Sequence, residues 1–202
     1  MDAKKNIKQS TLWKKNMSFV NYISNLNDAL NTVSTDAITV VYDLLLNCKK
    51  NNNTLYFCGN GGSAGNANHL ANDYIYGVAK KTGEGFKVQS LSANSSVLTC
   101  LANDVGYQNI YSEQIEVLGT KDDILVCLSG SGNSENILRA LEAAKNKKMK
   151  TISILGYDGG KAKLLSDHVV HVNINDMQIS EDFQLILFHY LMQKLYKEYS
   201  NV

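Results

Sequence analysis

His69 and Asp73 are two side chains that could do chemistry together. They lie four positions apart in a segment expected to be helical, so both should emerge on the same face of that helix. An imidazole beside a carboxylate can transfer a proton or bind a divalent metal ion. The sequence therefore offers an acid–base pair, or part of a metal site, at this point of the chain.

A glycine-rich loop, Asn60-Gly61-Gly62-Ser63, comes directly before that helix and follows an apolar run over 54–58 that is typical of a buried strand. Glycines let the backbone approach a ligand, and the unpaired N–H groups at a helix start attract anions. Ser63 is a candidate N-cap. An anion site beside His69 and Asp73 would suit a phosphorylated small molecule. An ordinary strand, turn and helix with polar residues on its solvent face explains this stretch equally well.

A second polar loop follows another apolar run, over 123–128. It reads Ser129-Gly130-Ser131-Gly132-Asn133-Ser134-Glu135-Asn136, and its hydroxyls and backbone N–H groups could hold a phosphate without any lysine. It lacks the Gly-Lys-Ser/Thr of a nucleotide-binding P-loop and the spacing of a dinucleotide fingerprint, which disfavours a nucleotide ligand. Two such loops after two strands are harder to explain as surface turns than one.

Strand and helix patterns alternate through most of the chain. Strands are expected over 54–58, 86–91, 123–128, 150–155 and 168–172, and helices over 62–79, 95–103, 107–118, 134–147, 160–165 and 178–198. Two amphipathic helices should precede them, one within 11–32 and one that begins near Ser34–Asp36 and ends in the polar run 47–53. Such alternation predicts a mostly parallel sheet with helices on both faces and ligands at the carboxyl ends of the strands.

Composition excludes several classes of protein. The 202 residues carry a net charge of +1 and are 44% hydrophobic, which permits a real core and gives no electrostatic reason to expect nucleic acid or a membrane as partner. No apolar run is long enough to span a bilayer, and the amino terminus does not resemble a signal peptide. The four cysteines have no metal-ligand spacing and fall in or beside predicted buried elements, so we expect reduced thiols in a cytoplasmic protein.

Four segments together resemble the sugar isomerase (SIS) domain family, and within it the phosphoheptose isomerase group. They are Cys58–Ser63, Asn103-Asp104-Val105-Gly106-Tyr107, Ser129–Ser134 and Gly156-Tyr157-Asp158-Gly159-Gly160-Lys161. The resemblance covers nearly the whole chain.

It implies a single domain over 1–202, with an N-terminal helical arm (1–52) and an α/β core (53–202). The core would be a flavodoxin-like three-layer sandwich with a five-stranded parallel sheet. The resemblance also implies a homotetramer with active sites between subunits.

The activity implied is aldose–ketose isomerisation of sedoheptulose 7-phosphate to D-glycero-D-manno-heptose 7-phosphate, through an enediol, for lipopolysaccharide or capsule heptose. Non-catalytic members of the family, which sense phosphosugars or act as scaffolds such as replication-initiation partners, are an alternative. An isomerase of another sugar phosphate is a third.

The same resemblance implies the site residues. Asp73 and His189 match the catalytic positions, and a zinc-binding subset places its ligands at His69, Asp73, Glu181 and His189. Substrate contacts fall on Asn60, Gly61, Gly62, Ser63, Asn94, Ser129, Gly130, Ser131, Ser134 and Glu181.

This chain differs from the family pattern near the site. Asp73 stands where the family has glutamate, Glu181 where it has glutamine, and Ala93-Asn94 where it has Ser-Asp; an arginine expected within 74–77 is absent. Whether Asp73 and His189 act as acid and base or as metal ligands stays open at this point.

Helix geometry adds a constraint on Glu181 and His189. They are eight positions apart, about 12 Å along a regular helix, whereas the ligands of one metal ion lie within a few ångströms of each other. We therefore expect either a break at the start of the last helix or a site that crosses a subunit interface.

Overall fold

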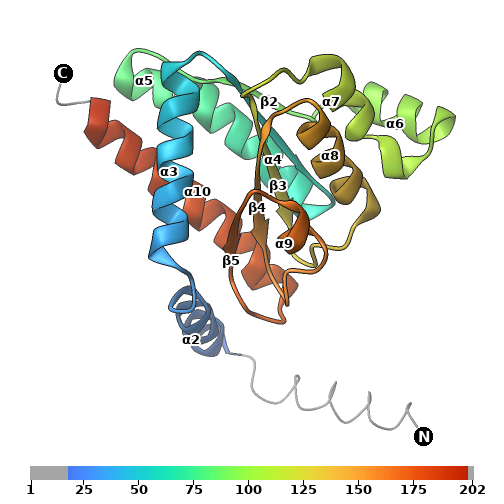
Figure 1. Cartoon of the computed structure of the whole chain (residues 1–202). Coiled ribbons are helices and arrows are strands. Elements are labelled where there is room, and N and C mark those ends of the chain that lie inside the picture. The colour runs from blue at the N-terminus through green and yellow to red at the C-terminus, as the bar shows by residue number, and fades with distance from the viewer. Residues whose placement is uncertain (1–17, 200–202) are drawn as a thin grey trace, which may run out of the picture. The chain divides into compact units, whose positions relative to one another are not determined.

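The computed structural model describes residues 18–199 (Figure 1). The described residues fall into two compact units, which divide between Thr32 and Val33. In the first unit, helix α2 spans Phe19–Leu30, and the Ser18 hydroxyl caps it by accepting the N–H of Asn21 at 3.1 Å. The part of the predicted first helix over 11–17 lies outside the described residues.

A five-stranded sheet forms the centre of the second unit. Its strands are β1 (Thr54–Gly59), β2 (Lys87–Ser90), β3 (Ile124–Ser129), β4 (Lys150–Leu155) and β5 (His168–His171). They lie in the order β2-β1-β3-β4-β5, and every neighbouring pair is parallel. The predicted five-stranded parallel sheet is therefore confirmed, with the strand order of flavodoxin-like folds.

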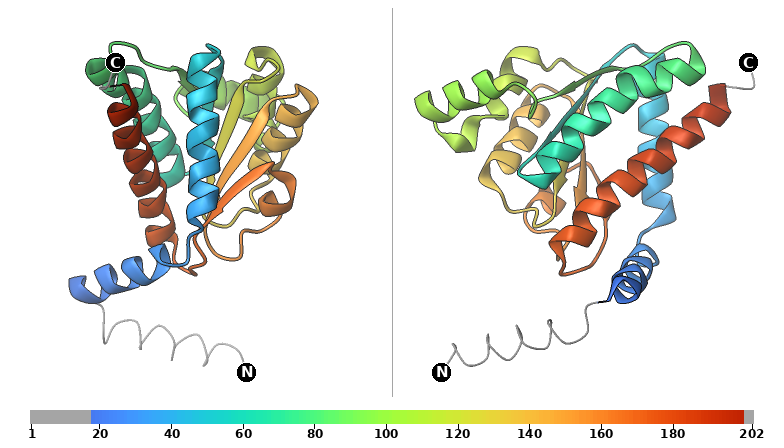
Figure 2. Two further views of the ribbon diagram at one scale, coloured as in Figure 1. Left: turned by 60° about the vertical axis from the view of Figure 1, so that its left-hand side comes forward. Right: turned by 180° about the vertical axis from the view of Figure 1, so that it is seen from behind.

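Helices cover both faces of this sheet, which makes the three predicted layers (Figure 2, left). Helices α3, α4 and α10 pack on one face and α8 and α9 on the other, with α7 against α8. The helices are α3 (Thr35–Lys50), α4 (Gly62–Asn72), α5 (Val78–Thr82), α6 (Ser95–Asp104), α7 (Ser112–Leu118), α8 (Glu135–Asn146), α9 (Ala162–Leu165) and α10 (Met177–Tyr199), with a π-helical turn η1 (Asp73–Gly77) and a 3-10 turn η2 (Tyr107–Asn109).

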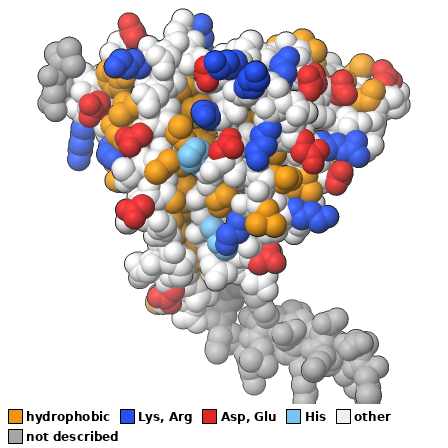
Figure 3. Space-filling model, in the orientation of Figure 1, with side chains coloured by type: hydrophobic (Ala, Val, Ile, Leu, Met, Phe, Trp, Pro, Cys, Tyr) orange, Lys and Arg blue, Asp and Glu red, His pale blue; other side chains and the backbone are white. Residues whose placement is uncertain are grey.

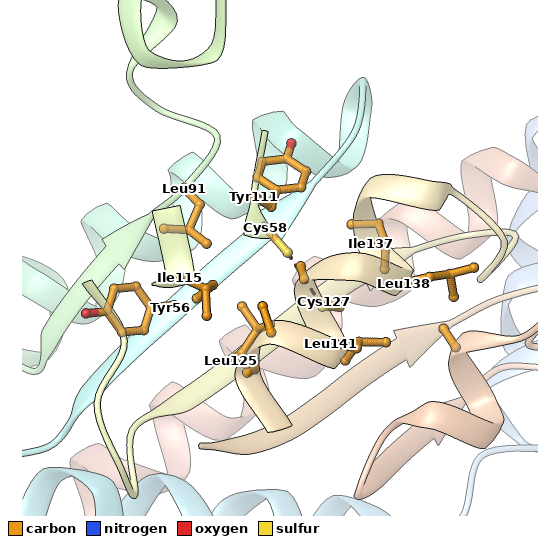
Figure 4. Close-up of a cluster of buried hydrophobic side chains, with 14 of the residues drawn as sticks. Tyr56, Cys58, Leu91, Tyr111, Ile115, Leu125, Cys127, Ile137, Leu138 and Leu141 are labelled. Carbon is orange, nitrogen blue, oxygen red and sulfur yellow. Dashed lines mark hydrogen bonds between the residues drawn. The ribbon is translucent and has the colours of Figure 1, made fainter. Parts of the chain in front are cut away.

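The side chains of the central strands alternate between two cores, as the pleat of a sheet requires. On the α8 side, Tyr56 and Cys58 of β1 pack with Leu125 and Cys127 of β3 in one buried cluster (Figure 4). Phe57 points to the other side and packs against rings from α10 and η1. Strands β1 and β3 are paired and buried on both faces. Their packing therefore defines where the two loops that follow them begin.

Three of the four cysteines are buried, as expected, and all four are free. Cys58 and Cys127 face each other on paired strands with 3.5 Å between their sulfur atoms. Burial, followed by the hydrogen bond to Cys58, raises the pKa of the Cys127 thiol well above its ordinary value, so it stays protonated. The expectation for Cys100 is wrong: α6 buries none of its residues, and Cys100 is exposed.

Among the described residues, no helix is long and apolar enough to cross a membrane. On the face shown in Figure 3, lysine and arginine side chains are interspersed with acidic ones, in keeping with the small net charge.

Candidate functional site

The two glycine-rich loops lie next to each other at the carboxyl edge of the sheet. They follow β1 and β3, which are neighbours, and the strand order reverses between these two strands. Ligands of such folds bind at this switch point. The loops are also joined directly, because Asn60 Nδ2 donates to Asn136 Oδ1 at 2.9 Å and Asn136 Nδ2 donates to Asn60 Oδ1 at 2.8 Å.

The first loop turns into α4 through Gly61. This residue has φ +56 and ψ −122, a conformation that glycine adopts without strain. The predicted role of Ser63 as N-cap is wrong, because Gly61 holds the cap position and Ser63 lies inside the first turn of α4. Its buried hydroxyl accepts instead from Gln184 Nε2 at 3.0 Å.

The second loop is held by its own hydroxyls and by the segment that follows β4, because the N–H groups of Lys161 and Ala162 donate to Asn133 Oδ1 and to the Gly132 carbonyl. Ser129 Oγ accepts from the N–H of Gly132 at 3.0 Å, and Ser131 Oγ accepts from the N–H of Asn133 at 3.3 Å. Gly130 contributes its carbonyl to the N–H of Gly156. Ser134 occupies the N-cap position of α8 without a side-chain capping bond, so its hydroxyl is free of that task.

Helices α4 and α10 run side by side in the same direction. Residues that come later in α4 and η1 contact residues that come later in α10. Ser63 contacts Gln184, His69 contacts His189, and Gly77 accepts from the Tyr196 hydroxyl. This pairing brings residues about 120 positions apart into one site.

His69, Asp73 and His189 meet at one point on this helix pair. His69 Nε2 lies 3.1 Å from His189 Nε2 and 3.2 Å from Asp73 Oδ2, and His189 Nε2 lies 3.3 Å from Asp73 Oδ2. The side chain of Asp73 is 17% exposed, and those of His69 and His189 are 48% and 40% exposed. The group is thus reachable from solvent but seated on packed helices.

The geometry of this triangle fits a metal ion. Each imidazole nitrogen presents one lone pair or one N–H in the ring plane, and a carboxylate only accepts, so at most two of the three contacts can be hydrogen bonds. Tetrahedral ligands with bonds of about 2.0–2.1 Å lie about 3.3–3.4 Å apart, close to the three observed sides. These three residues could therefore hold a metal ion.

A π-helical turn sets the position of Asp73. The helix predicted over 62–79 is interrupted by η1, which begins at Asp73 and bonds the N–H of Val78 to the Asp73 carbonyl; such turns often occur at functional sites. The hydroxyl of the next residue, Tyr74, donates to the carbonyl of Phe188 at 3.2 Å. Burial first, and then the Asp73 charge, raise the pKa of Tyr74 well above its ordinary value. The phenol therefore stays protonated and keeps donating to Phe188. Because Tyr74 follows Asp73 and Phe188 precedes His189, this bond holds Asp73 and His189 near each other.

Glu181 does not join this group within the chain. Its carboxylate lies against Gly62, where an added Cβ would overlap it, and its main-chain carbonyl accepts from Asn66 at 3.0 Å. The expected break in the last helix is wrong, because α10 is one continuous helix across Glu181 and His189. The other explanation, a site that crosses a subunit interface, stays a prediction.

Asn94 has a structural task. Its Oδ1 accepts from the N–H groups of Ser96 and Val97 at 3.1 and 3.2 Å, which caps α6. An asparagine before a predicted helix carries this signal in the sequence.

Gln184 and Asn136 are site residues to which sequence reasoning gave no role. Gln184 is buried and hydrogen-bonded to Ser63 and Asn66. In the sequence, a polar residue on the mostly apolar face of the last helix could have indicated such a role. Asn136 is also buried, in the first turn of α8.

Residues 18–156 match the family model of the SIS domain. The chain therefore belongs to the SIS domain family.

Among its relatives, the phosphoheptose isomerase of Helicobacter pylori (strain Shi470) is 39% identical over 158 residues, covering 78% of this chain and 82% of the relative. That of a Nitratiruptor species is 39% identical over 142 residues, covering 70% and 75%. Within the SIS family, the chain thus belongs with the phosphoheptose isomerases.

Solved structures agree in fold. The phosphoheptose isomerase of Neisseria gonorrhoeae superposes with a TM-score of 0.79 at 28% identity, covering 94% of this chain and 98% of that one. A phosphoheptose isomerase from Francisella tularensis gives 0.82 at 24% identity, covering 98% and 100%.

Proposed function

We propose that this protein is a phosphoheptose isomerase that converts sedoheptulose 7-phosphate to D-glycero-D-manno-heptose 7-phosphate for lipopolysaccharide or capsule heptose. The observation that carries the proposal is the convergence of His69, Asp73 and His189 beside the two glycine-rich loops. Ser63 and His69 are six residues apart on α4, about 9 Å along the helix. An open-chain heptose phosphate can reach from the loops to the triangle.

The loops bind the phosphate end. Backbone N–H groups at the starts of α4 and α8, with the hydroxyls of Ser63, Ser129, Ser131 and Ser134, form a neutral cradle in which the helix ends favour the negative charge. Asn60 contacts the sugar.

Asp73 and His189 share the proton transfers: Asp73 acts on the carbon-bound proton, and His189 acts on the hydroxyl protons through Nδ1, because its Nε2 faces the other two ligand atoms. The reaction moves a proton from C1 of the ketose to C2, and a hydroxyl proton from O1 to O2, through the enediol. Oδ2 of Asp73 faces both imidazoles, whereas Oδ1, 3.4 Å from the Asn72 amide, is left to take the proton from carbon. A positioned acid–base pair of this kind contributes about 10²–10⁴-fold to a rate.

His69, Asp73 and His189 would hold the metal, which we propose is zinc because two imidazoles and a carboxylate suit it. When bound, such an ion polarises the sugar carbonyl and so acidifies the proton on C1. Glu181, which belongs to α10 and lies against Gly62 at the start of α4, is left to contact the substrate. The assembly we propose is a homotetramer with active sites between subunits.

The test is to incubate the purified protein with sedoheptulose 7-phosphate and follow aldose formation with and without a chelator. We expect turnover that the chelator abolishes and added zinc restores. Absence of turnover in both conditions, with sugar-phosphate binding retained, would favour a phosphosugar sensor, the alternative that Asn94 and the missing arginine within 74–77 leave open. A metal-free preparation with full activity would rule out the metal.

A further inference from the structure

We propose that Tyr107 is a positioning residue whose hydroxyl orients the side-chain amide of Asn60, so that Asn60 Nδ2 offers an N–H to the bound sugar phosphate. The inference rests on the proposed function. It gives a role to the segment Asn103–Tyr107, which the site described above does not use.

The amide pair of Asn60 and Asn136 cannot by itself fix the orientation of either side chain. Each amide donates one N–H to the other and accepts one in return, at 2.9 and 2.8 Å. If both amides rotated by half a turn, oxygen and nitrogen would exchange places and the same two hydrogen bonds would form again. A third contact is needed to choose between the two states.

Tyr107 supplies that contact. Its hydroxyl lies 2.9 Å from Asn60 Oδ1 and donates to it, so this oxygen accepts two hydrogen bonds, one from Tyr107 and one from Asn136. Asn60 Nδ2 gives one hydrogen to Asn136 and keeps the other on the side away from Tyr107. In the rotated state Tyr107 could only accept from Asn60 Nδ2, so its own proton would lose this acceptor. The side away from Tyr107 would then present the amide oxygen to the electron-rich oxygens of a sugar phosphate.

The side chain of Tyr107 is 57% exposed, and the residues on either side, Gly106 and Asn109, shape and tie down the main chain that carries it. Gly106 has φ +91 and ψ 149, a conformation that is essentially restricted to glycine, and it turns the chain from α6 into η2. Asn109, in η2, accepts from Arg139 Nη1 at 2.8 Å. Arg139, the only arginine of the chain, lies on α8, the helix that carries Asn136.

The position also agrees with a ligand. Asn60, Tyr107 and Arg139 line a pocket of about 490 Å³ together with Ser134 of the second loop. Asn60 and Ser134 therefore belong both to the lining of this pocket and to the two loops of the proposed phosphate cradle.

The test is a double-mutant cycle with Tyr107→Phe and Asn60→Ala in the full chain. It is measured as kcat/KM for sedoheptulose 7-phosphate and as the dissociation constant of sedoheptitol 7-phosphate, whose carbonyl is reduced so that it cannot isomerise. We expect Tyr107→Phe to lower kcat/KM and to raise the dissociation constant, each by about 3- to 10-fold, the effect of one hydrogen bond. In the Asn60→Ala background the same change should have less than about a twofold effect, because the amide on which Tyr107 acts is gone.

A matched control removes a hydroxyl far from the loops. Tyr56 donates to the carbonyl of Leu118 at 2.9 Å in the core, and Tyr56→Phe should lower the melting temperature but leave both readouts unchanged. A Tyr107→Phe effect of equal size in both backgrounds, or no effect in either, would overturn the inference.

The outcomes separate the two proposals. Wild-type protein that binds the reduced sugar phosphate without turning over the ketose overturns the isomerase, and the cycle in dissociation constants still tests Tyr107. Turnover with an additive cycle overturns only the role of Tyr107. Wild-type protein that neither binds nor turns over overturns both.

Discussion

The length of a single side chain, Asp73, sets the geometry of the candidate active site. Its Oδ2 already lies 3.2 and 3.3 Å from the nitrogens of His69 and His189, so one more methylene would push the carboxylate past them by roughly 1 Å. We expect Asp73→Glu to lower kcat/KM by about 10²-fold although the family carries glutamate there, since displacements of this size have such effects. Asp73→Asn should lower it by about 10²–10⁴-fold because the proton acceptor is lost. If Asp73→Glu kept the kcat/KM of the wild type, the backbone would have to shift to accommodate the longer side chain, and the length of this side chain would not set the geometry of the site.

Metal content decides the role of Glu181. The group of His69, Asp73 and His189 forms without it, so Glu181→Ala should retain the metal content of the wild type and raise KM instead. His69→Ala removes a corner of the triangle and should lose the metal. Elemental analysis of both purified variants gives the answer. Equal loss of metal in the two would place Glu181 among the ligands, supplied across a subunit interface.

At the scale of elements, the sequence predicted the fold more completely than the site. Hydrophobic runs and glycine breaks located all five strands, because both are local signals. The π-helical turn at Asp73 was not predictable, since the hydroxyl of Tyr74 within this turn bonds to Phe188 of α10, 114 positions away in the sequence. From the sequence Ser63 is a cap candidate, and nothing local indicates that its hydroxyl bonds to Gln184, 121 positions away. His189 was found only by resemblance, because nothing local pairs α4 with α10.

The packing of the second loop can be tested at Gly132. This residue has φ +65, and an added Cβ would overlap the carbonyl of Gly159, so Gly132→Ala should lower the free energy of unfolding by about 1–3 kcal/mol. Gly65 is the matched control, because it lies within α4 and a Cβ added there would meet nothing beyond its own helix within 4 Å. Gly65→Ala should raise the free energy of unfolding by about 0.5–1 kcal/mol. Denaturant titration compares the two, and equal stability of the variants would contradict the loop packing.

At the scale of the molecule, the site joins distant parts of one folded unit, residues 33–202. If Asn60 to Asp73, the loop at Ser129–Ser134 and His189 contact the ligand as proposed, binding should stabilise the whole unit and not one loop. At 100 times its dissociation constant a ligand adds about 2.7 kcal/mol, and for this chain length each kcal/mol raises the melting temperature by about 2–4 °C. We therefore expect sedoheptitol 7-phosphate to raise it by about 5–11 °C at fixed protein concentration. The sugar alcohol without phosphate should give little shift at the same concentration, because the two loops then lack the anion that joins them; an equal shift from both would show that the loops do not anchor the ligand.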